Sequence, residues 1–166
     1  MAQKPEKIKP LPGQESVWDY PRPPRLERSE KHVQVLFNGV IIVDSIQAFR
    51  VLETSHPPVY YIPKQDIQMK YLSPTDRNTF CEFKGAAIYY SIQVGNKAAA
   101  NAAWSYPNPS AGYAEIRDHL AFYPALMDQC FVDGEMVTPQ PGGFYGGWIT
   151  RDVVGPFKGE PGSWGW

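Results

Sequence analysis

The chain has 166 residues, of which 43% are hydrophobic and 20% are charged, and its formal net charge is −1. This length supports one domain with a hydrophobic core, and this composition excludes an intrinsically disordered chain. A net charge so close to zero argues against the basic surface that non-specific nucleic-acid or membrane binding requires, so neither partner is expected.

Proline marks the first part of the chain. Residues 1–31 contain six prolines and little apolar periodicity, which is typical of an extended, partly polyproline-like segment. We call this segment the N-terminal arm and expect Trp18 and Tyr20 to hold it against the body of the protein. No apolar leader follows Met1, and no apolar run reaches the roughly 18 residues of a membrane helix. We therefore expect a cytoplasmic protein.

Pairs of turn residues indicate two hairpins. Apolar side chains alternate at residues 33–37, which predicts a half-buried strand. Asn38-Gly39 then predicts a tight turn, because both residues tolerate positive φ, and residues 40–43 form the returning strand. The second hairpin is expected at residues 129–132 and 135–137, joined by Asp133-Gly134.

Short strands and turns are expected between these hairpins. With 17 prolines, 14 glycines and 14% aromatic residues, the chain favours a mainly β fold with many turns and few helices. Residues 73–76 predict a turn and residues 114–120 a short helix, while residues 97–103 fit either a strand or a helical turn. Further strands are expected at residues 59–62, 79–83, 86–94 and 120–122.

The chain divides into three parts by composition. A β-rich core domain is expected over residues 32–138, between the N-terminal arm and a tail at residues 139–166. The tail is rich in glycine and tryptophan, and we expect Trp148, Trp164 and Trp166 to hold it on the core.

Residues 79–92 combine a cysteine, a lysine and a run of strand-forming residues. One interpretation is a core strand with a buried Cys81 and a solvated Lys84, which is where these residue types usually lie. The other interpretation places Lys84 in a pocket, where its ammonium group binds a carboxylate or a phosphate. Alternation along a strand puts the two side chains on opposite faces unless a bulge at Gly85 resets the register.

The sequence shows no motif for a metal or a cofactor. Cys81 and Cys130 are the only cysteines and form no paired zinc-ligand motif. No helix is expected after the glycine-rich residues 142–147, so they lack the helix-end N–H groups that bind phosphate. No closely spaced pair of carboxylates indicates a magnesium site. We therefore expect no metal and no cofactor.

Several motifs in the middle of the chain resemble those of the domain-of-unknown-function family numbered 427, which is also labelled nucleotidyltransferase-like. The resemblance covers residues 32–138. It rests on Asn38-Gly39, Asp44-Ser45, Leu52-Glu53-Thr54, Pro58-Val-Tyr-Tyr-Ile-Pro63, Thr79-x-Cys81-x-x-Lys84-Gly85-x-Ala87-x-Tyr89, Ala103-Trp104-Ser-Tyr106-Pro107 and Ala121-Phe-Tyr123. The resemblance implies a small fold of curved antiparallel sheets around a pocket, similar to the tent-shaped β folds of methionine sulfoxide reductase B. The four cysteines that bind zinc in such relatives are missing here.

A set of charged and aromatic residues is the candidate ligand site, and its grouping rests partly on the resemblance. The cations would bind an anion, the glutamate would take a proton or neutralise a cation, and the rings would form the wall of a pocket. The set is Arg50, Glu53, Tyr60, Tyr61, Lys84, Tyr89, Trp104, Tyr106 and Tyr123. The alternative is an aromatic core with one buried ion pair.

Three hypotheses for function follow. The first is a small-molecule-binding pocket formed by this set. The second is an enzyme, either a nucleotidyltransferase or a thiol enzyme, with Cys81, Glu53 and Lys84 as catalytic candidates. The third is an interaction module whose proline- and tryptophan-rich ends bind a partner or a second copy, which would be a homodimer.

Overall fold

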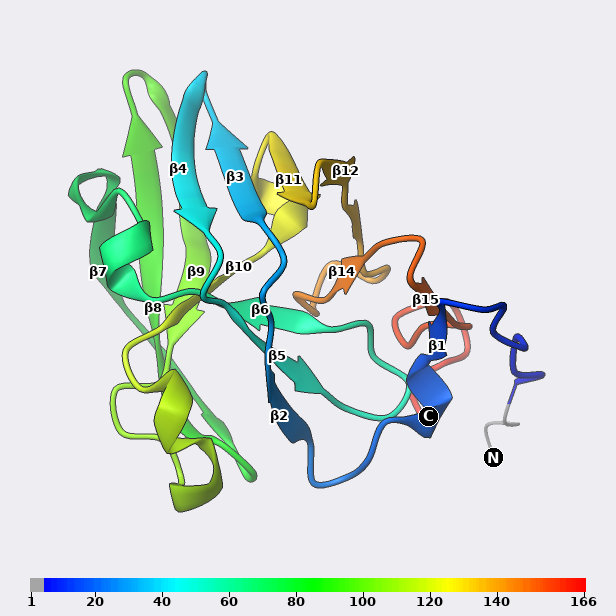
Figure 1. Ribbon diagram of the computed structural model, residues 1–166. Helices are drawn as coiled ribbons and strands as arrows, with labels where there is room; N and C mark the ends of the chain where they lie inside the picture. The colour runs from blue at the N-terminus through cyan, green and yellow to red at the C-terminus, as the bar shows by residue number, and fades with distance from the viewer. Residues whose placement is uncertain (1–4) are drawn as a thin grey trace.

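The computed structural model describes residues 5–166, and it consists mainly of strands joined by tight turns (Figure 1). The strands are β1 (Glu15–Ser16), β2 (Arg25–Arg28), β3 (Val33–Phe37), β4 (Val40–Ser45), β5 (Phe49–Leu52), β6 (Val59–Tyr61), β7 (Leu72–Cys81), β8 (Gly85–Val94), β9 (Lys97–Ser105), β10 (Leu120–Phe122), β11 (Gln129–Val132), β12 (Glu135–Met136), β13 (Thr138–Pro139), β14 (Trp148–Ile149) and β15 (Val153–Val154). The helical segments are short 3-10 turns: η1 (Val17–Asp19), η2 (Lys64–Asp66), η3 (Met69–Tyr71), η4 (Ala111–Ile116) and η5 (Pro124–Leu126).

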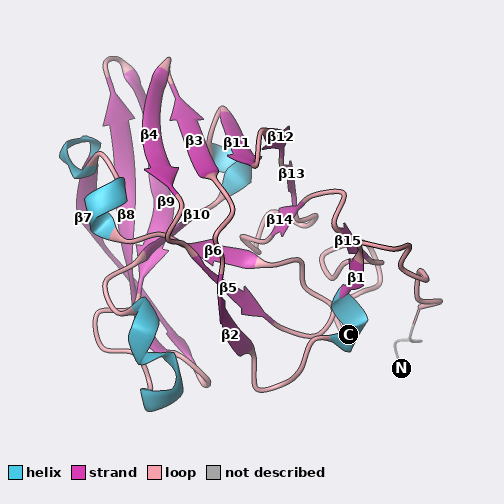
Figure 2. Cartoon of the chain, viewed as in Figure 1, coloured by secondary structure: helices cyan, strands magenta, loops and turns pink. Residues whose placement is uncertain are grey.

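Three antiparallel sheets form the body of the molecule (Figure 2). Their strand orders are β10–β9–β8–β7, β12–β11–β3–β4 and β2–β5–β6. In Figure 1 the third sheet lies below the second and beside the lower part of the first. It meets the first sheet where Ile62 and Leu120 exchange backbone hydrogen bonds. The mainly β, antiparallel fold that the sequence predicts is confirmed.

Both predicted hairpins are confirmed. The side chains of β3 alternate between buried and half-buried, and Asn38 and Gly39 turn the chain with φ of 46° and 77°. Asp133 and Gly134 repeat this geometry with φ of 49° and 79° between β11 and β12. Positive φ at both central residues matches the right-handed twist of the flanking strands, which is why these residue pairs specify hairpins.

Two local predictions are wrong. Residues 73–76 do not end a strand, because β7 runs from Leu72 to Cys81 and absorbs the proline as a register shift between Pro74 and Asn78. A bulge on an edge strand tolerates the missing proline N–H, so the strand continues. The helix expected at residues 114–120 is instead η4, which ends at Ile116. Asp118 then takes a φ of +60°, which no helix can contain, and β10 begins at Leu120.

The two long hairpin strands β8 and β9 take part in two different buried clusters. Their closed end packs aliphatic residues such as Ile92 and Val94 against β3 and β4. Their other end contributes aromatic residues, including Tyr89 and Trp104, to a second cluster beside β5 and β6. Residues 97–103, which fit either a strand or a helical turn, lie in β9.

The two ends of the chain contact each other and the body. β1 pairs in parallel with β15, and β2 joins β5 at the edge of the third sheet. Trp148 is buried and donates its Nε1–H to the carbonyl oxygen of Phe122 at 3.1 Å, whereas Trp164 is 80% exposed and holds nothing in place. The division of the chain at residues 31 and 139 stays a prediction. Within residues 5–166, none of the helices has the length and apolar character needed to cross a membrane.

Candidate functional site

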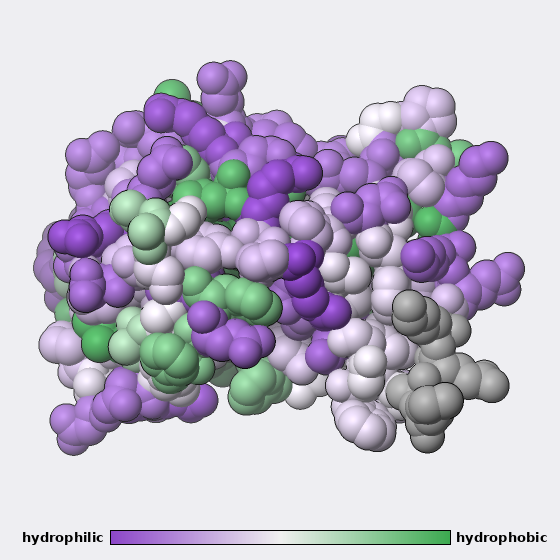
Figure 3. Space-filling model, turned by 90° about the horizontal axis from the view of Figure 1, so that it is seen from below, coloured by the Kyte–Doolittle hydropathy of each residue, from purple (hydrophilic) through white to green (hydrophobic). Residues whose placement is uncertain are grey.

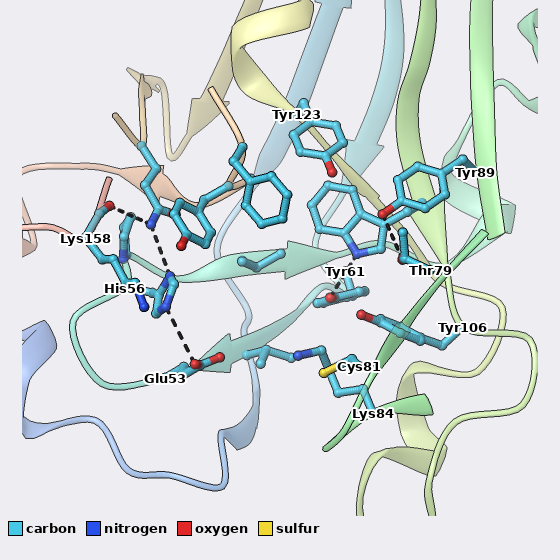
Figure 4. A pocket seen from close by; sticks show the side chains of 18 of the residues that line it. Glu53, His56, Tyr61, Thr79, Cys81, Lys84, Tyr89, Tyr106, Tyr123 and Lys158 are labelled. Atoms are coloured by element: carbon cyan, nitrogen blue, oxygen red, sulfur yellow. Dashed lines mark hydrogen bonds and ion pairs between the residues drawn. The ribbon is translucent and has the colours of Figure 1, made fainter. Parts of the chain in front are cut away.

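A cavity of about 380 Å³ opens where the aromatic end of β8 and β9 faces the third sheet. Aromatic side chains from several elements form most of its wall (Figure 4). They are Tyr61, Phe80, Tyr89, Trp104, Tyr106, Tyr123, Phe144 and Tyr145. Figure 3 shows apolar patches between polar residues on the lower face of the molecule. At the rim of the cavity, Phe80 and Phe144 are 78% and 71% exposed.

Strand alternation and register place the rings. Val59 and Tyr61 lie on the same face of β6 and both line the cavity, because side chains two residues apart share a face of a strand. Tyr89 of β8 stands directly opposite Trp104 of β9. Trp104 packs against Tyr123 with 4.5 Å between ring centroids. Aromatic residues that are far apart in the sequence therefore lie together on one wall of the cavity.

Three buried tyrosines of this wall keep their phenol protons at neutral pH. Burial raises the pKa values of Tyr61, Tyr106 and Tyr123 well above the ordinary value of 10. The Trp104 Nε1–H donates to the Tyr61 hydroxyl at 3.2 Å, and the Thr79 and Tyr89 hydroxyls are 3.0 Å apart. The rings thus give the wall an apolar surface, and hydroxyl groups held by hydrogen bonds give it polar groups at defined positions.

Lys84 lies in the turn between β7 and β8, and only 8% of the residue is exposed. The interpretation that leaves it solvated is wrong, because the loop after β9 covers this turn, with the Ser110 N–H donating to the Lys84 carbonyl oxygen at 2.9 Å. Within the described part of the chain, its ammonium group has neither an ion-pair partner nor a hydrogen-bond acceptor. Its nearest aromatic neighbour is the Tyr106 ring, whose centroid is 5.9 Å from Nζ.

Cys81 lines the same cavity as Lys84. It is the last residue of β7, it is half-buried, and its thiol is free. Figure 4 shows its sulfur atom beside the Lys84 side chain, beneath the rings of Tyr61 and Tyr106. The turn, not a bulge within a strand, brings the thiol and the ammonium group to one cavity.

The opposite side of the cavity is polar, with Glu53 directly after β5 and His56 three residues later (Figure 4). Glu53 Oε2 lies 3.6 Å from His56 Nε2 and 3.4 Å from Arg22 Nε. Burial lowers the pKa of His56 to about 4, so its ring is neutral at pH 7. The neighbour of Glu53 on this side is thus a neutral imidazole and not an imidazolium cation.

Two members of the predicted set lie elsewhere. Arg50 points away from the cavity and forms ion pairs with Glu15 at 2.7 Å and Glu27 at 2.6 Å. Alternation along β5 is the reason, because Val51 and the following Glu53 face the cavity and Arg50 faces the other side. Tyr60 likewise alternates with Tyr61 and packs against Trp148. The other seven residues line the cavity.

Sequence reasoning missed several lining residues. They include His56, which precedes two prolines, and Gln140, Tyr145 and Lys158 of the tail. They also include Arg77, whose guanidinium lies 4.7 Å from the Tyr89 ring centroid. No local pattern marks these residues, because their neighbours in the cavity are far away in the sequence. Among residues 5–166, no three His, Cys, Asp or Glu side chains are grouped to hold a metal ion.

Comparison with known proteins places this site within a family. Residues 25–133 match the family described as Domain of unknown function (DUF427). The chain belongs to this family. No curated protein matches the chain. The matched region contributes Glu53, Cys81, Lys84 and the strand-borne rings, whereas the tail residues at the cavity lie outside it.

Proposed function

We propose that the cavity binds a small acidic molecule with a planar or apolar body. The observation that carries the proposal is Lys84, a residue only 8% exposed whose side chain lines the aromatic cavity. Its ammonium group pairs with no carboxylate of residues 5–166, so an anionic ligand in the cavity can be its partner. A carboxylate or phosphate at Nζ would form a charge-assisted hydrogen bond.

The charges around the cavity favour an anion. Three cations line it, Arg77, Lys84 and Lys158, against the single carboxylate of Glu53 among the described lining residues. Arg77 and Lys84 also lie near the rings of Tyr89 and Tyr106, at 4.7 Å and 5.9 Å from their centroids. A cationic ligand would therefore meet rings whose partial negative charge already attracts a resident cation.

The size of the cavity limits the ligand. A volume of about 380 Å³ lies near the lower end of the roughly 300–1,000 Å³ that ligand pockets span. The rings of Trp104 and Tyr123 offer flat apolar surface, and the phenol hydroxyls offer donors that fix orientation. These features support a compact aromatic acid better than a long or branched molecule.

The test is a thermal-shift screen with small aromatic acids, and with nucleotides in the presence and absence of Mg²⁺. A ligand at 100 times its Kd stabilises the folded protein by about 2.7 kcal/mol, which raises Tm by several degrees. We expect an acid to produce this shift and Lys84→Met to remove it.

Lys70→Met is the matched control, because Lys70 is exposed and its Nζ also lies over a tyrosine ring, 5.2 Å from the Tyr71 centroid. It should leave the shift unchanged. Equal loss of the shift in both variants, or no loss in Lys84→Met, would contradict the proposal. A shift with nucleotides alone would favour nucleotidyl transfer instead.

A thiol enzyme is the second candidate, because Cys81 lines the same cavity as the unpaired ammonium group of Lys84. The Cys81 thiol is free and half-buried, so a reagent that enters the cavity can reach it. Native protein treated with iodoacetamide at neutral pH should be alkylated at Cys81, while Cys130, which is 2% exposed and whose pKa burial raises to about 12, is the internal reference. Equal inertness of both thiols would remove this candidate.

A further inference from the structure

The cavity has two polar ends. Lys84 lies at one end and Glu53 at the other. Glu53 Oε2 lies 3.4 Å from Arg22 Nε and 3.6 Å from His56 Nε2. Within residues 5–166, Glu53 Oε1 accepts no hydrogen bond. A carboxylate oxygen that faces a cavity without a donor is a strong acceptor, and it favours a ligand that brings an N–H or O–H group.

A hydrogen-bond network holds this end in place and fixes its chemistry. Gln140 Oε1 accepts from the Gly147 N–H at 3.1 Å, and Gln140 Nε2 donates to the Lys158 carbonyl oxygen at 2.9 Å. These two bonds set the orientation of the amide, so its second N–H donates to His56 Nδ1 at 3.1 Å. The imidazole proton is therefore on Nε2, toward Glu53, and the neutral ring orients the carboxylate without cancelling its charge.

The two ends of the cavity face each other without pairing. Lys84 enters from the β7–β8 turn and Glu53 from the end of β5, and Figure 4 shows them on opposite sides. Neither side chain is an ion-pair partner of the other within the 4.0 Å limit. Since a direct ion pair would satisfy both groups, a molecule that occupies the space between them has to satisfy each separately.

Resting on the function proposed above, we infer that the ligand is bifunctional: an aromatic acid whose acidic group binds Lys84 and whose amino or hydroxyl group donates to Glu53. A ligand with a second acidic group at the far end would place like charges together. A ligand with an apolar far end would bury the Glu53 carboxylate without a donor, which costs binding free energy. The amino- or hydroxy-substituted aromatic acid avoids both penalties.

The test measures Kd by titration calorimetry for benzoate and for its 2-, 3- and 4-amino derivatives. In the wild type, at least one aminobenzoate is expected to bind about ten-fold tighter than benzoate or more, which is the effect of one hydrogen bond to a charged group. Glu53→Met should abolish this preference, because aminobenzoate loses its acceptor and benzoate, which no longer buries a carboxylate without a donor, binds more tightly. Lys84→Met should weaken both ligands by a similar factor.

Glu135→Met is the matched control. The Glu135 side chain is 25% exposed and pairs with Arg151 Nε at 3.1 Å, while the Glu53 side chain is 26% exposed and pairs with Arg22 Nε at 3.4 Å. Glu135 is not among the residues that line the cavity, so this variant should keep the amino preference. Thermal unfolding of both variants shows that they are folded before titration.

The outcomes separate the two proposals. Benzoate binding without any amino preference, or a preference that survives Glu53→Met, overturns the bifunctional ligand and leaves the acid-binding cavity standing. Benzoate affinity that is unchanged in Lys84→Met overturns the acid site at Lys84. If no aromatic acid binds the wild type, both proposals are wrong.

Discussion

The two ends of strands β8 and β9 differ in how completely neighbouring side chains fill the space around them. At the closed end, Ile92 and Val94 pack with Phe37 and Phe122 in an aliphatic and aromatic core that needs no polar partner. At the other end, Trp104 and its neighbouring tyrosines bring polar atoms and leave a cavity of about 380 Å³. One end of the hairpin thus contributes to the core, and the other end lines the cavity that we propose as a binding site.

The largest expected effect comes from opening the closed end. Phe122 is fully buried, so Phe122→Ala should lower the free energy of unfolding by about 3–5 kcal/mol, through lost transfer free energy and the cavity that remains. Urea unfolding measures this loss. Phe80 at the rim of the natural cavity is 78% exposed, so Phe80→Ala should change stability by no more than about 0.5 kcal/mol. Similar losses of unfolding free energy in Phe122→Ala and Phe80→Ala would contradict the proposed difference between the two ends.

The polar side of the cavity predicts a pH dependence. Burial lowers the pKa of His56 from 6.5 to about 4. Between these values the unfolded state binds more protons than the folded state, so stability falls as pH falls. From pH 7 to pH 4 the loss due to His56 should be on the order of 2–3 kcal/mol, with little change from pH 7 to pH 8.

Urea unfolding of wild type and His56→Gln at pH 7 and pH 4.5 checks this dependence. The variant carries no titrating ring at position 56, so its stability should fall less than that of the wild type. Parallel losses in the two proteins would show that other groups cause the acid sensitivity.

A substitution at Gly146 tests whether the tail closes one side of the cavity. A Cβ atom at Gly146 would lie 2.2 Å from Trp104 Cη2, and the Trp104 ring also packs against Tyr123. Gly146→Ala should therefore cost about 1–3 kcal/mol, as overpacking does, and increase the rate at which iodoacetamide alkylates Cys81. Gly112→Ala is the control, because nothing lies within 4 Å of a Cβ atom there. An unchanged alkylation rate in Gly146→Ala would mean that the tail does not close the cavity.

Lys84→Met is expected to change stability little. The Lys84 side chain lines a cavity and forms no ion pair within residues 5–166, so its loss should change the free energy of unfolding by no more than about 1 kcal/mol. A structural lysine would behave oppositely, and a loss of more than about 2 kcal/mol in urea unfolding would assign Lys84 to the fold. This measurement decides whether the aromatic end is a site or a core.

Alternation and turn chemistry explain which parts of this picture were predictable. Asn38-Gly39 and Asp133-Gly134 specify their hairpins by local backbone preference, which does not depend on distant residues. The same period-2 rule shows that Arg50 cannot share a face with Glu53, so its exclusion from the cavity follows once β5 is known to run from Phe49 to Leu52. The prediction grouped them because charge and family motifs outweighed strand geometry.

The network at the polar end could not be predicted in this way. His56 and Gln140 are 84 positions apart, and nothing near either residue in the sequence indicates the other. Their meeting depends on how the tail crosses Pro57 and Trp104, where glycines at 146 and 147 allow close approach. Contacts of this kind arise from the packing of whole elements, and the local sequence does not indicate them.

The sequence by itself determined the mainly β class, the two tight hairpins and the strands that carry Tyr61 and Tyr89, because these depend on backbone preference and side-chain period over a few residues. Only the tertiary structure decided that Lys84 is buried without a partner, that Glu53 faces it without pairing, and that tail residues close the cavity. Burial and electrostatic pairing are properties of the space between elements, so they exist only once the chain has folded.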